Sequence, residues 1–175
     1  MVKDEATEQE VYTLELLMKQ AKVGVHDRRV VTVAKEIAEE RKCAVITLEL
    51  ADGRIVSGKT TDLLGPASAV LLNAVKALGN IADEMHLIAP AYINPIQGLK
   101  TKFLGSKNPR LHTDEVLIAL SMCAATDALA KLALEQLPKL KGCQAHSTVM
   151  LTEGDFKIFK KLGIELTNDP VYETM

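Results

Sequence analysis

The regular alternation of strand and helix patterns after residue 43 limits this chain to a small group of folds. Two β-rich runs, 43–50 and 54–59, flank Asp52-Gly53, a dipeptide typical of a tight hairpin turn. Helix and strand patterns then alternate, at residues 65–78 (helix), 85–89 (strand), 113–137 (helix), 143–151 (strand), 153–162 (helix) and 164–167 (strand). The pattern therefore predicts an α/β fold, a three-layer α/β/α sandwich around a mixed, mostly parallel sheet with the hairpin at one edge.

Two amphipathic helices are predicted before the sheet. Apolar residues recur at helical spacing over 8–21 and again over 27–42. This divides the chain into an N-terminal helical appendage, residues 1–42, and an α/β/α domain, residues 43–175. Isolated helices of this length are marginal in water, so their apolar side chains need a partner surface, especially Leu14, Leu17 and Val30. We therefore expect a homo-oligomer.

Composition argues against several classes of function. A net charge of −2, with both signs interspersed, argues against binding to nucleic acid or to an anionic membrane. The three cysteines, Cys43, Cys123 and Cys143, form no Cys-x-x-Cys pair and fit a reducing compartment. The first residues lack the apolar region of a signal peptide, and the longest mostly apolar run, 116–134, holds polar and charged residues. We expect a cytoplasmic protein with no membrane span.

A long irregular connection is predicted over residues 90–111. It carries four cations, Lys100, Lys102, Lys107 and Arg110, which form either a solvated loop or a clamp for phosphate or carboxylate groups. The helix start at 65–68 offers free backbone N–H groups, which serve either ordinary capping or an anion. Ligands of α/β sheets collect at the carboxyl ends of the strands. We therefore expect one pocket for an anion, a phosphorylated small molecule or nucleotide, lined by Ser68, Lys102, Ser106, Lys107, Asn108 and His146.

The segment 140–148 concentrates Cys143, His146, Ser147 and Thr148 on a predicted interior strand. Cys143 with His146 or His112 is a candidate nucleophile and base, and the alternative is a buried thiol beside a hydrogen-bonded core histidine. Cys143 and His146 are three residues apart, so on a strand their side chains point to opposite faces. No metal site is predicted, and the sequence identifies neither a cofactor nor a reaction.

The order of elements around Asp52-Gly53-Arg54 is similar to the cytidine-deaminase-like fold. In those enzymes the helix after the hairpin begins with a His/Cys-Ala-Glu motif and the next helix with Pro-Cys-x-x-Cys, which together hold zinc. Here the two helix starts read Gly65-Pro66-Ala67-Ser68-Ala69 and Leu111-His112-Thr113-Asp114-Glu115. The resemblance therefore implies the fold without the deaminase zinc site, and fold alone does not carry function.

A closer resemblance covers most of the chain and rests on four segments, 72–76, 104–108, 115–121 and 140–148. They resemble the C-terminal part of a bacterial family known as domain of unknown function 1846. The resemblance implies a domain of a longer bacterial protein, and it implies no established activity. Two functions are open. The domain contributes an anion-binding site to a larger protein, or it is a scaffold for assembly or domain contact without an active site.

Overall fold

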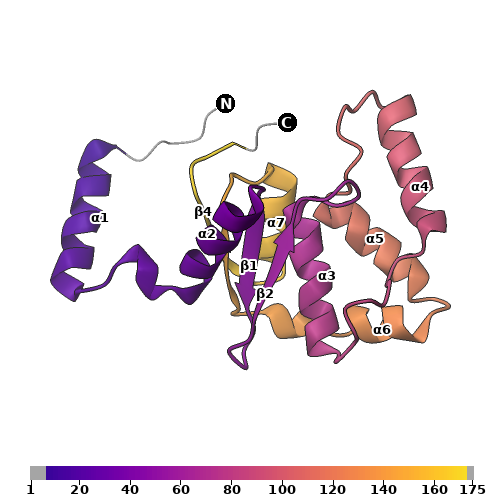
Figure 1. The fold of residues 1–175 in the computed structure, drawn as a ribbon, viewed down its shortest axis with the longest axis horizontal. Helices are drawn as coiled ribbons and strands as arrows, with labels where there is room; N and C mark the ends of the chain where they lie inside the picture. The colour runs from indigo at the N-terminus through magenta and orange to yellow at the C-terminus, as the bar shows by residue number, and fades with distance from the viewer. Residues whose placement is uncertain (1–6, 173–175) are drawn as a thin grey trace.

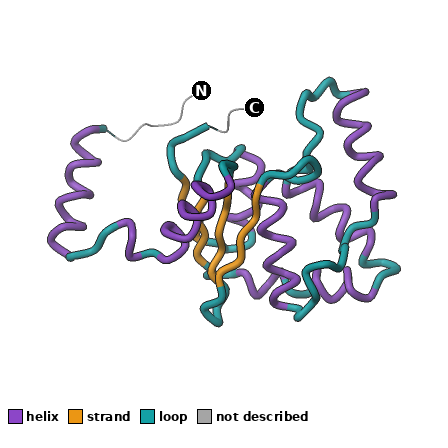
Figure 2. Tube along the Cα trace, in the orientation of Figure 1, coloured by secondary structure: helices purple, strands orange, loops and turns teal. Residues whose placement is uncertain are grey.

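The computed structural model describes residues 7–172 as a four-stranded sheet with helices on both faces (Figures 1 and 2). The strands are β1 (Val45–Glu49), β2 (Ile55–Lys59), β3 (Gln144–Ser147) and β4 (Glu165–Asn168). The α-helices are α1 (Glu8–Ala21), α2 (Arg29–Arg41), α3 (Pro66–Leu78), α4 (Pro90–Gly98), α5 (Thr113–Cys123), α6 (Ala128–Leu134) and α7 (Glu153–Lys161). Three short helical segments, η1 (Val25–Asp27), η2 (Leu99–Phe103) and η3 (Leu137–Leu140), connect them.

The strand order is β2-β1-β3-β4, and the predicted hairpin β1–β2 does place β2 at one edge. The predicted α/β class, a three-layer α/β/α sandwich around a mixed sheet, is confirmed. The sheet is not mostly parallel, however, because β1 is antiparallel to both β2 and β3 and only β3–β4 is a parallel pair. The predicted strand at 85–89 is an irregular segment whose Leu87 and Ile88 pack into the core. That segment therefore adds no parallel strand.

The two faces of β1 are covered by different helices. Ile46 and Leu48 belong to the main apolar core, together with residues of α3, α5, α6 and α7. Thr47 faces the opposite way, and its hydroxyl donates to the carbonyl of Val30 in α2, at 2.6 Å. Helix α2 is thus an outer layer of the sandwich, packed against the sheet by Val30 and its buried neighbours. The expectation that Val30 seeks an outside partner is wrong, because Val30 is fully buried.

Helix α3 lies directly against β2, and Gly58 makes this contact possible. A Cβ atom at Gly58 would lie 2.1 Å from the backbone nitrogen of Val70 and 2.6 Å from the carbonyl oxygen of Pro66. Backbone atoms of a packed helix cannot move aside as a flexible side chain can. Glycine at residue 58 therefore sets the distance between this edge strand and the helix that covers it.

The segment 90–111 is more ordered than its proline and glycine content suggests. Helix α4 begins with Pro90 at its first turn, and it continues directly into the π-helical turn η2. Lys100 is buried, and its ammonium contacts the Glu115 carboxylate at 2.8 Å. The predicted long helix 113–137 is also interrupted after Cys123. Asp127 caps a new helix, α6, by accepting hydrogen bonds from the N–H groups of Leu129 and Ala130.

Candidate functional site

A groove of about 490 Å³ lies along the edge strand β2. It is bounded by the C-terminal end of α2, by helix α3 and by residues 86–93, which lead into α4. We call it the β2 groove. Its apolar walls come from these three sides, and its volume is in the range of small-molecule sites, roughly 300–1,000 Å³. The apolar lining residues are Ile37, Leu63, Leu64, Ala69, Leu72, Leu87, Ile88 and Ile93.

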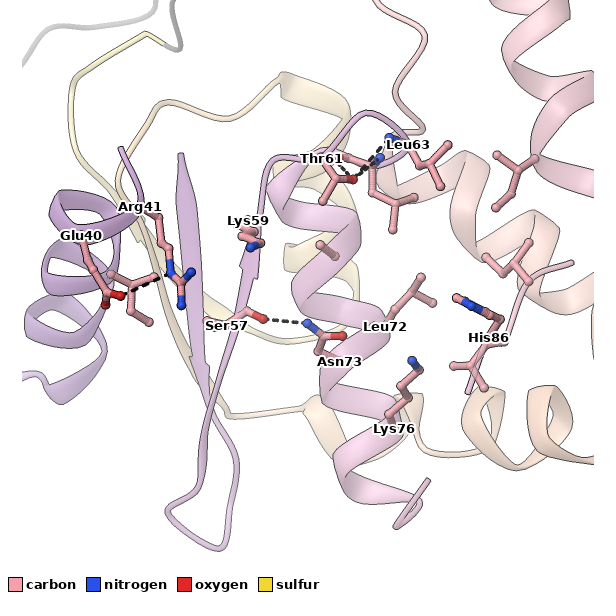
Figure 3. Close-up of a pocket in the computed structure, with 16 residues that line it drawn as sticks. Glu40, Arg41, Ser57, Lys59, Thr61, Leu63, Leu72, Asn73, Lys76 and His86 are labelled. Atoms are coloured by element: carbon pink, nitrogen blue, oxygen red, sulfur yellow. Dashed lines mark hydrogen bonds and ion pairs between the residues drawn. The ribbon is translucent and has the colours of Figure 1, made fainter. Parts of the chain in front are cut away.

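Cationic side chains reach this groove from three different elements. Arg41 on α2, Lys59 on β2 and Lys76 on α3 all line the groove, and Figure 3 shows them spread along it, with His86 at the opposite end from Arg41. Glu40 is the one acidic residue among the described residues that line it, and its carboxylate lies 3.5 Å from Nε of Arg41. The three permanent cations therefore outnumber the carboxylate, which gives the groove a positive potential.

Two polar contacts hold the walls of the groove in place. Asn73 donates from Nδ2 to the carbonyl oxygen of Ser57, at 2.8 Å, and so ties α3 to the edge strand (Figure 3). The Lys76 ammonium donates to the carbonyl oxygen of Asp83, at 2.8 Å. A backbone carbonyl carries no net charge, so Lys76 keeps its positive charge available to a ligand.

The starts of α3 and α5 adjoin, as the resemblance to deaminases implies. The Ser68 hydroxyl and the Gly65 N–H both donate to the carbonyl oxygen of Leu111, at 2.8 and 3.3 Å. Beside them is a small cavity of about 90 Å³, which is also lined by His112 and by Asp155 of α7. The N-terminal ends of three helices therefore meet around one small space.

The carboxylate of Asp155 occupies the N-terminal end of α5. It accepts hydrogen bonds from the N–H and hydroxyl of Thr113, at 2.9 and 2.8 Å, and from the Thr152 hydroxyl, at 2.8 Å. Its other contact is Nδ1 of His112, at 3.2 Å. Burial raises the pKa of Asp155, but the hydrogen bonds from His112, Thr113 and Thr152 outweigh burial and lower this pKa to about 2.

His112 and Asp155 form a hydrogen-bonded pair between these helix starts. The hydrogen bond to Asp155 raises the pKa of His112, and partial burial opposes the rise. Within residues 7–172, no cluster of three or more His, Cys, Asp or Glu side chains could hold a metal ion. The Asp155 carboxylate already offsets the partial positive charge at the N-terminal end of α5. We therefore regard this network as a structural tie between α5 and α7.

The residues predicted to form one anion pocket do not share a single pocket. Lys107 and Asn108 line one surface hollow, but Ser68, Lys102 and His146 line no part of it. Ser68 is buried and bonded to Leu111, whereas Lys102 and Lys107 are exposed. Ser106 and Asn108 bond each other in a local turn, in which the Asn108 N–H donates to the Ser106 hydroxyl at 3.2 Å. A turn of this kind meets its own hydrogen-bonding needs without a ligand.

His146 lies on the other face of the sheet from Ser68. In the β1–β3 register His146 is opposite Thr47, which faces α2, whereas Ser68 belongs to α3 on the core face. The structure therefore does not bring His146 together with the predicted anion loop. Asn108 and Arg110 of that loop line the small cavity beside His112.

His146 and Cys143 are both buried, and they do not form a nucleophile–base pair. His146 contacts the Thr167 hydroxyl through Nδ1 at 2.9 Å, and its Nε2 lies 3.5 Å from an Asp169 carboxylate oxygen. Burial lowers the pKa of His146, and Asp169 opposes this effect. Burial also raises the pKa of Cys143, which keeps it a thiol and a weak nucleophile.

The cations of the β2 groove were missed by sequence reasoning because each belongs to an ordinary amphipathic element. Lys59 ends the second hairpin strand, and Arg41 and Lys76 lie in the last turns of their helices. Cations are common at helix C-terminal ends, where they interact with the backbone dipole. Because α3 packs against β2, these separate positions line one groove.

Comparisons with known proteins agree with the resemblance found in the sequence. Residues 26–175 match the family model described as "Domain of unknown function DUF1846, C-terminal". The chain is 50% identical over 160 residues to the UPF0371 protein SUB1165 of Streptococcus uberis, covering 91% of this chain and 32% of that protein. It is 48% identical over 170 residues to the UPF0371 protein SpyM50764 of Streptococcus pyogenes serotype M5, covering 97% and 34%.

The chain thus spans about a third of the length of these curated relatives. No helix within residues 7–172 combines the length and the apolar character needed to cross a membrane. The family match includes α2 and every strand, so it covers all three layers of the sandwich. The chain therefore belongs to the bacterial DUF1846 family and corresponds to that family's C-terminal domain.

Proposed function

We propose that this domain binds a small organic anion in the β2 groove and so contributes a ligand site to the longer proteins of its family. The ligand class is a phosphorylated or carboxylated molecule with an apolar part, which includes nucleotides. The observation that carries the proposal is that Arg41, Lys59 and Lys76 all line one groove that has apolar walls and a single carboxylate. This location replaces the pocket expected around Ser106–Asn108 and His146.

The apolar and the charged side chains of the groove would bind different parts of the ligand. Apolar walls remove the body of the ligand from water, while the lysine and arginine side chains pair with its phosphate or carboxylate. Leu72 and Ile88 form part of these walls. Because the groove is open along the edge strand, the charged contacts are partly solvated and each contributes about 1 kcal/mol.

Ligand binding should raise the thermal stability of this domain, since a molecule that binds only the folded state stabilises it. We expect a sugar phosphate or a nucleoside monophosphate to raise the unfolding temperature more than inorganic phosphate does. Lys59→Ala should weaken binding of the best ligand about 5-fold, which corresponds to about 1 kcal/mol. Isothermal titration calorimetry measures this change.

Lys107→Ala is the matched control, because Lys107 is also an exposed cation and does not line the β2 groove. It should leave the affinity unchanged. Equal weakening by Lys59→Ala and Lys107→Ala would show only a general effect of net charge. That result, or the absence of stabilisation by any organic anion, would refute the proposal.

A contact domain without chemistry is the second candidate function, and exposed apolar side chains favour it. Phe103, the last residue of η2, is 80% exposed, and Leu104, which follows it, is 71% exposed. Helix α1 has no buried residue. Apolar surface of this extent is typical of contacts with another protein or domain. The two functions are compatible, because the groove and these surfaces share no residue.

A further inference from the structure

Helix α1 is a complete helix that makes little contact with the rest of the described structure. It stands apart from the sandwich, beyond η1, and none of its 14 residues is buried (Figure 1). Its first turn carries a capping box formed by Thr7 and Glu10, and Lys22 caps its end in the left-handed conformation. Isolated helices shorter than about 12–15 residues are marginal in water, so local capping alone does not account for a helix of this length.

One side of α1 carries an apolar stripe. Val11, Leu14, Met18 and Ala21 recur at alternating spacings of three and four residues, the pattern of a helix–helix seam. Val11 and Leu14 are 45% and 59% exposed, and Leu17 beside them is 55% exposed. These side chains therefore present a surface that a second helix can cover.

The charges of α1 suit one kind of second helix. The first turn carries Glu8 and Glu10, whereas Lys19 lies in the last turn and Lys22 caps it. In an antiparallel pair of α1 helices, the acidic end of each copy faces the basic end of the other. The two helix dipoles then point in opposite directions, which is the favourable arrangement. A parallel pair would place like charges together. Glu15, near the middle, approaches its own copy in either case, so it does not select an orientation.

We propose that α1 pairs in an antiparallel manner with α1 of a second copy of this chain, which gives a two-fold symmetric homodimer. An isologous contact of this kind requires a self-complementary surface, and the apolar stripe with opposite charges at its two ends provides one. The proposal goes beyond ligand binding and is independent of it, since no residue of α1 lines the β2 groove.

Light scattering coupled to size exclusion tests the dimer directly. The wild-type chain should show twice its monomer mass of 19.0 kDa. Leu14→Asp should give the monomer mass, because it places a carboxylate in the centre of the seam. Ile118→Asp is the matched control, since Ile118 of α5 is 61% exposed, close to the 59% of Leu14, and lies outside α1, and it should remain a dimer. A monomeric wild type, or a Leu14→Asp variant that still dimerises, overturns the proposal.

A charge-reversal cycle tests the orientation, because Glu8 of one copy should lie near Lys22 of the other. Glu8→Lys and Lys22→Glu should each raise the dimer dissociation constant several-fold at low salt, and the double variant should restore it. Circular dichroism of each variant checks that α1 stays helical. A double variant that dimerises more weakly than both single variants contradicts antiparallel pairing.

Discussion

Gly58→Ala should lower the free energy of unfolding by about 3 kcal/mol or more, an unusually large effect for the addition of one methyl group. The new Cβ would lie 2.1 Å from the backbone nitrogen of Val70, so either β2 or α3 must move. Both elements contribute to the main core, through residues such as Val56 and Val70. Movement of either one loosens this packing and also distorts the β2 groove. Denaturant unfolding monitored by circular dichroism measures the loss.

Gly98→Ala provides the control for this experiment. Gly98 is the last residue of α4, and a Cβ added there meets nothing within 4 Å. Alanine is the better helix former by about 1 kcal/mol, so this variant should be as stable as the wild type or slightly more stable. If Gly58→Ala unfolds at the same denaturant concentration as Gly98→Ala, the close contact between β2 and α3 does not exist in solution.

The sandwich could be predicted from the sequence because its signals are local. Asp52-Gly53 specifies a turn whatever surrounds it, and α3 carries its own start signal in Gly65-Pro66. The predicted strand at 85–89 was wrong, because the apolar character of Leu87 and Ile88 has another cause. Both fill the core from an irregular segment, and a short apolar run cannot distinguish this from a buried strand.

The candidate site could not be predicted, because it depends on which face of the sheet each residue occupies. Ser68 and His146 are both buried polar residues, but the register of β3 against β1 places His146 beneath α2. A shift of one residue in that register would reverse its direction. Similarly, Lys59 and Lys76 line one groove because Gly58 lets α3 approach β2. Neither fact has a local sequence signal.

Asp155→Ala should cost about 3–5 kcal/mol of stability, comparable to breaking a buried ion pair. Asp155 is 6% exposed, and its carboxylate accepts hydrogen bonds from both the N–H and the hydroxyl of Thr113. Removing it leaves these donors, and the imidazole of His112, without their acceptor. Asp114→Ala is the control, because Asp114 is an exposed carboxylate in the same first turn of α5, and its loss should cost well under about 1 kcal/mol.

The same carboxylate should make the protein labile in acid. The folded-state pKa of Asp155 is about 2, below its ordinary value of 3.8, so the unfolded chain takes up a proton first as the pH falls. The stabilisation from this shift is therefore complete above about pH 4 and is lost between about pH 4 and pH 2, which amounts to about 2 kcal/mol. His112, whose pKa is raised by the same contact, works in the other direction. Its contribution to stability is complete below its ordinary pKa of 6.5 and is lost as the pH rises through the raised value.

Asp155→Asn isolates this contribution, because an amide of the same shape cannot titrate. Unfolding free energies measured from pH 5 down to pH 2 should fall more steeply for the wild type than for Asp155→Asn. The reason is that the variant lacks the group whose pKa differs between the folded and unfolded states. Asp114→Asn is the matched control, since it makes the same substitution at an exposed carboxylate in the same first turn of α5. Parallel profiles for the wild type and Asp155→Asn would mean that the helix-end network does not hold a charged Asp155.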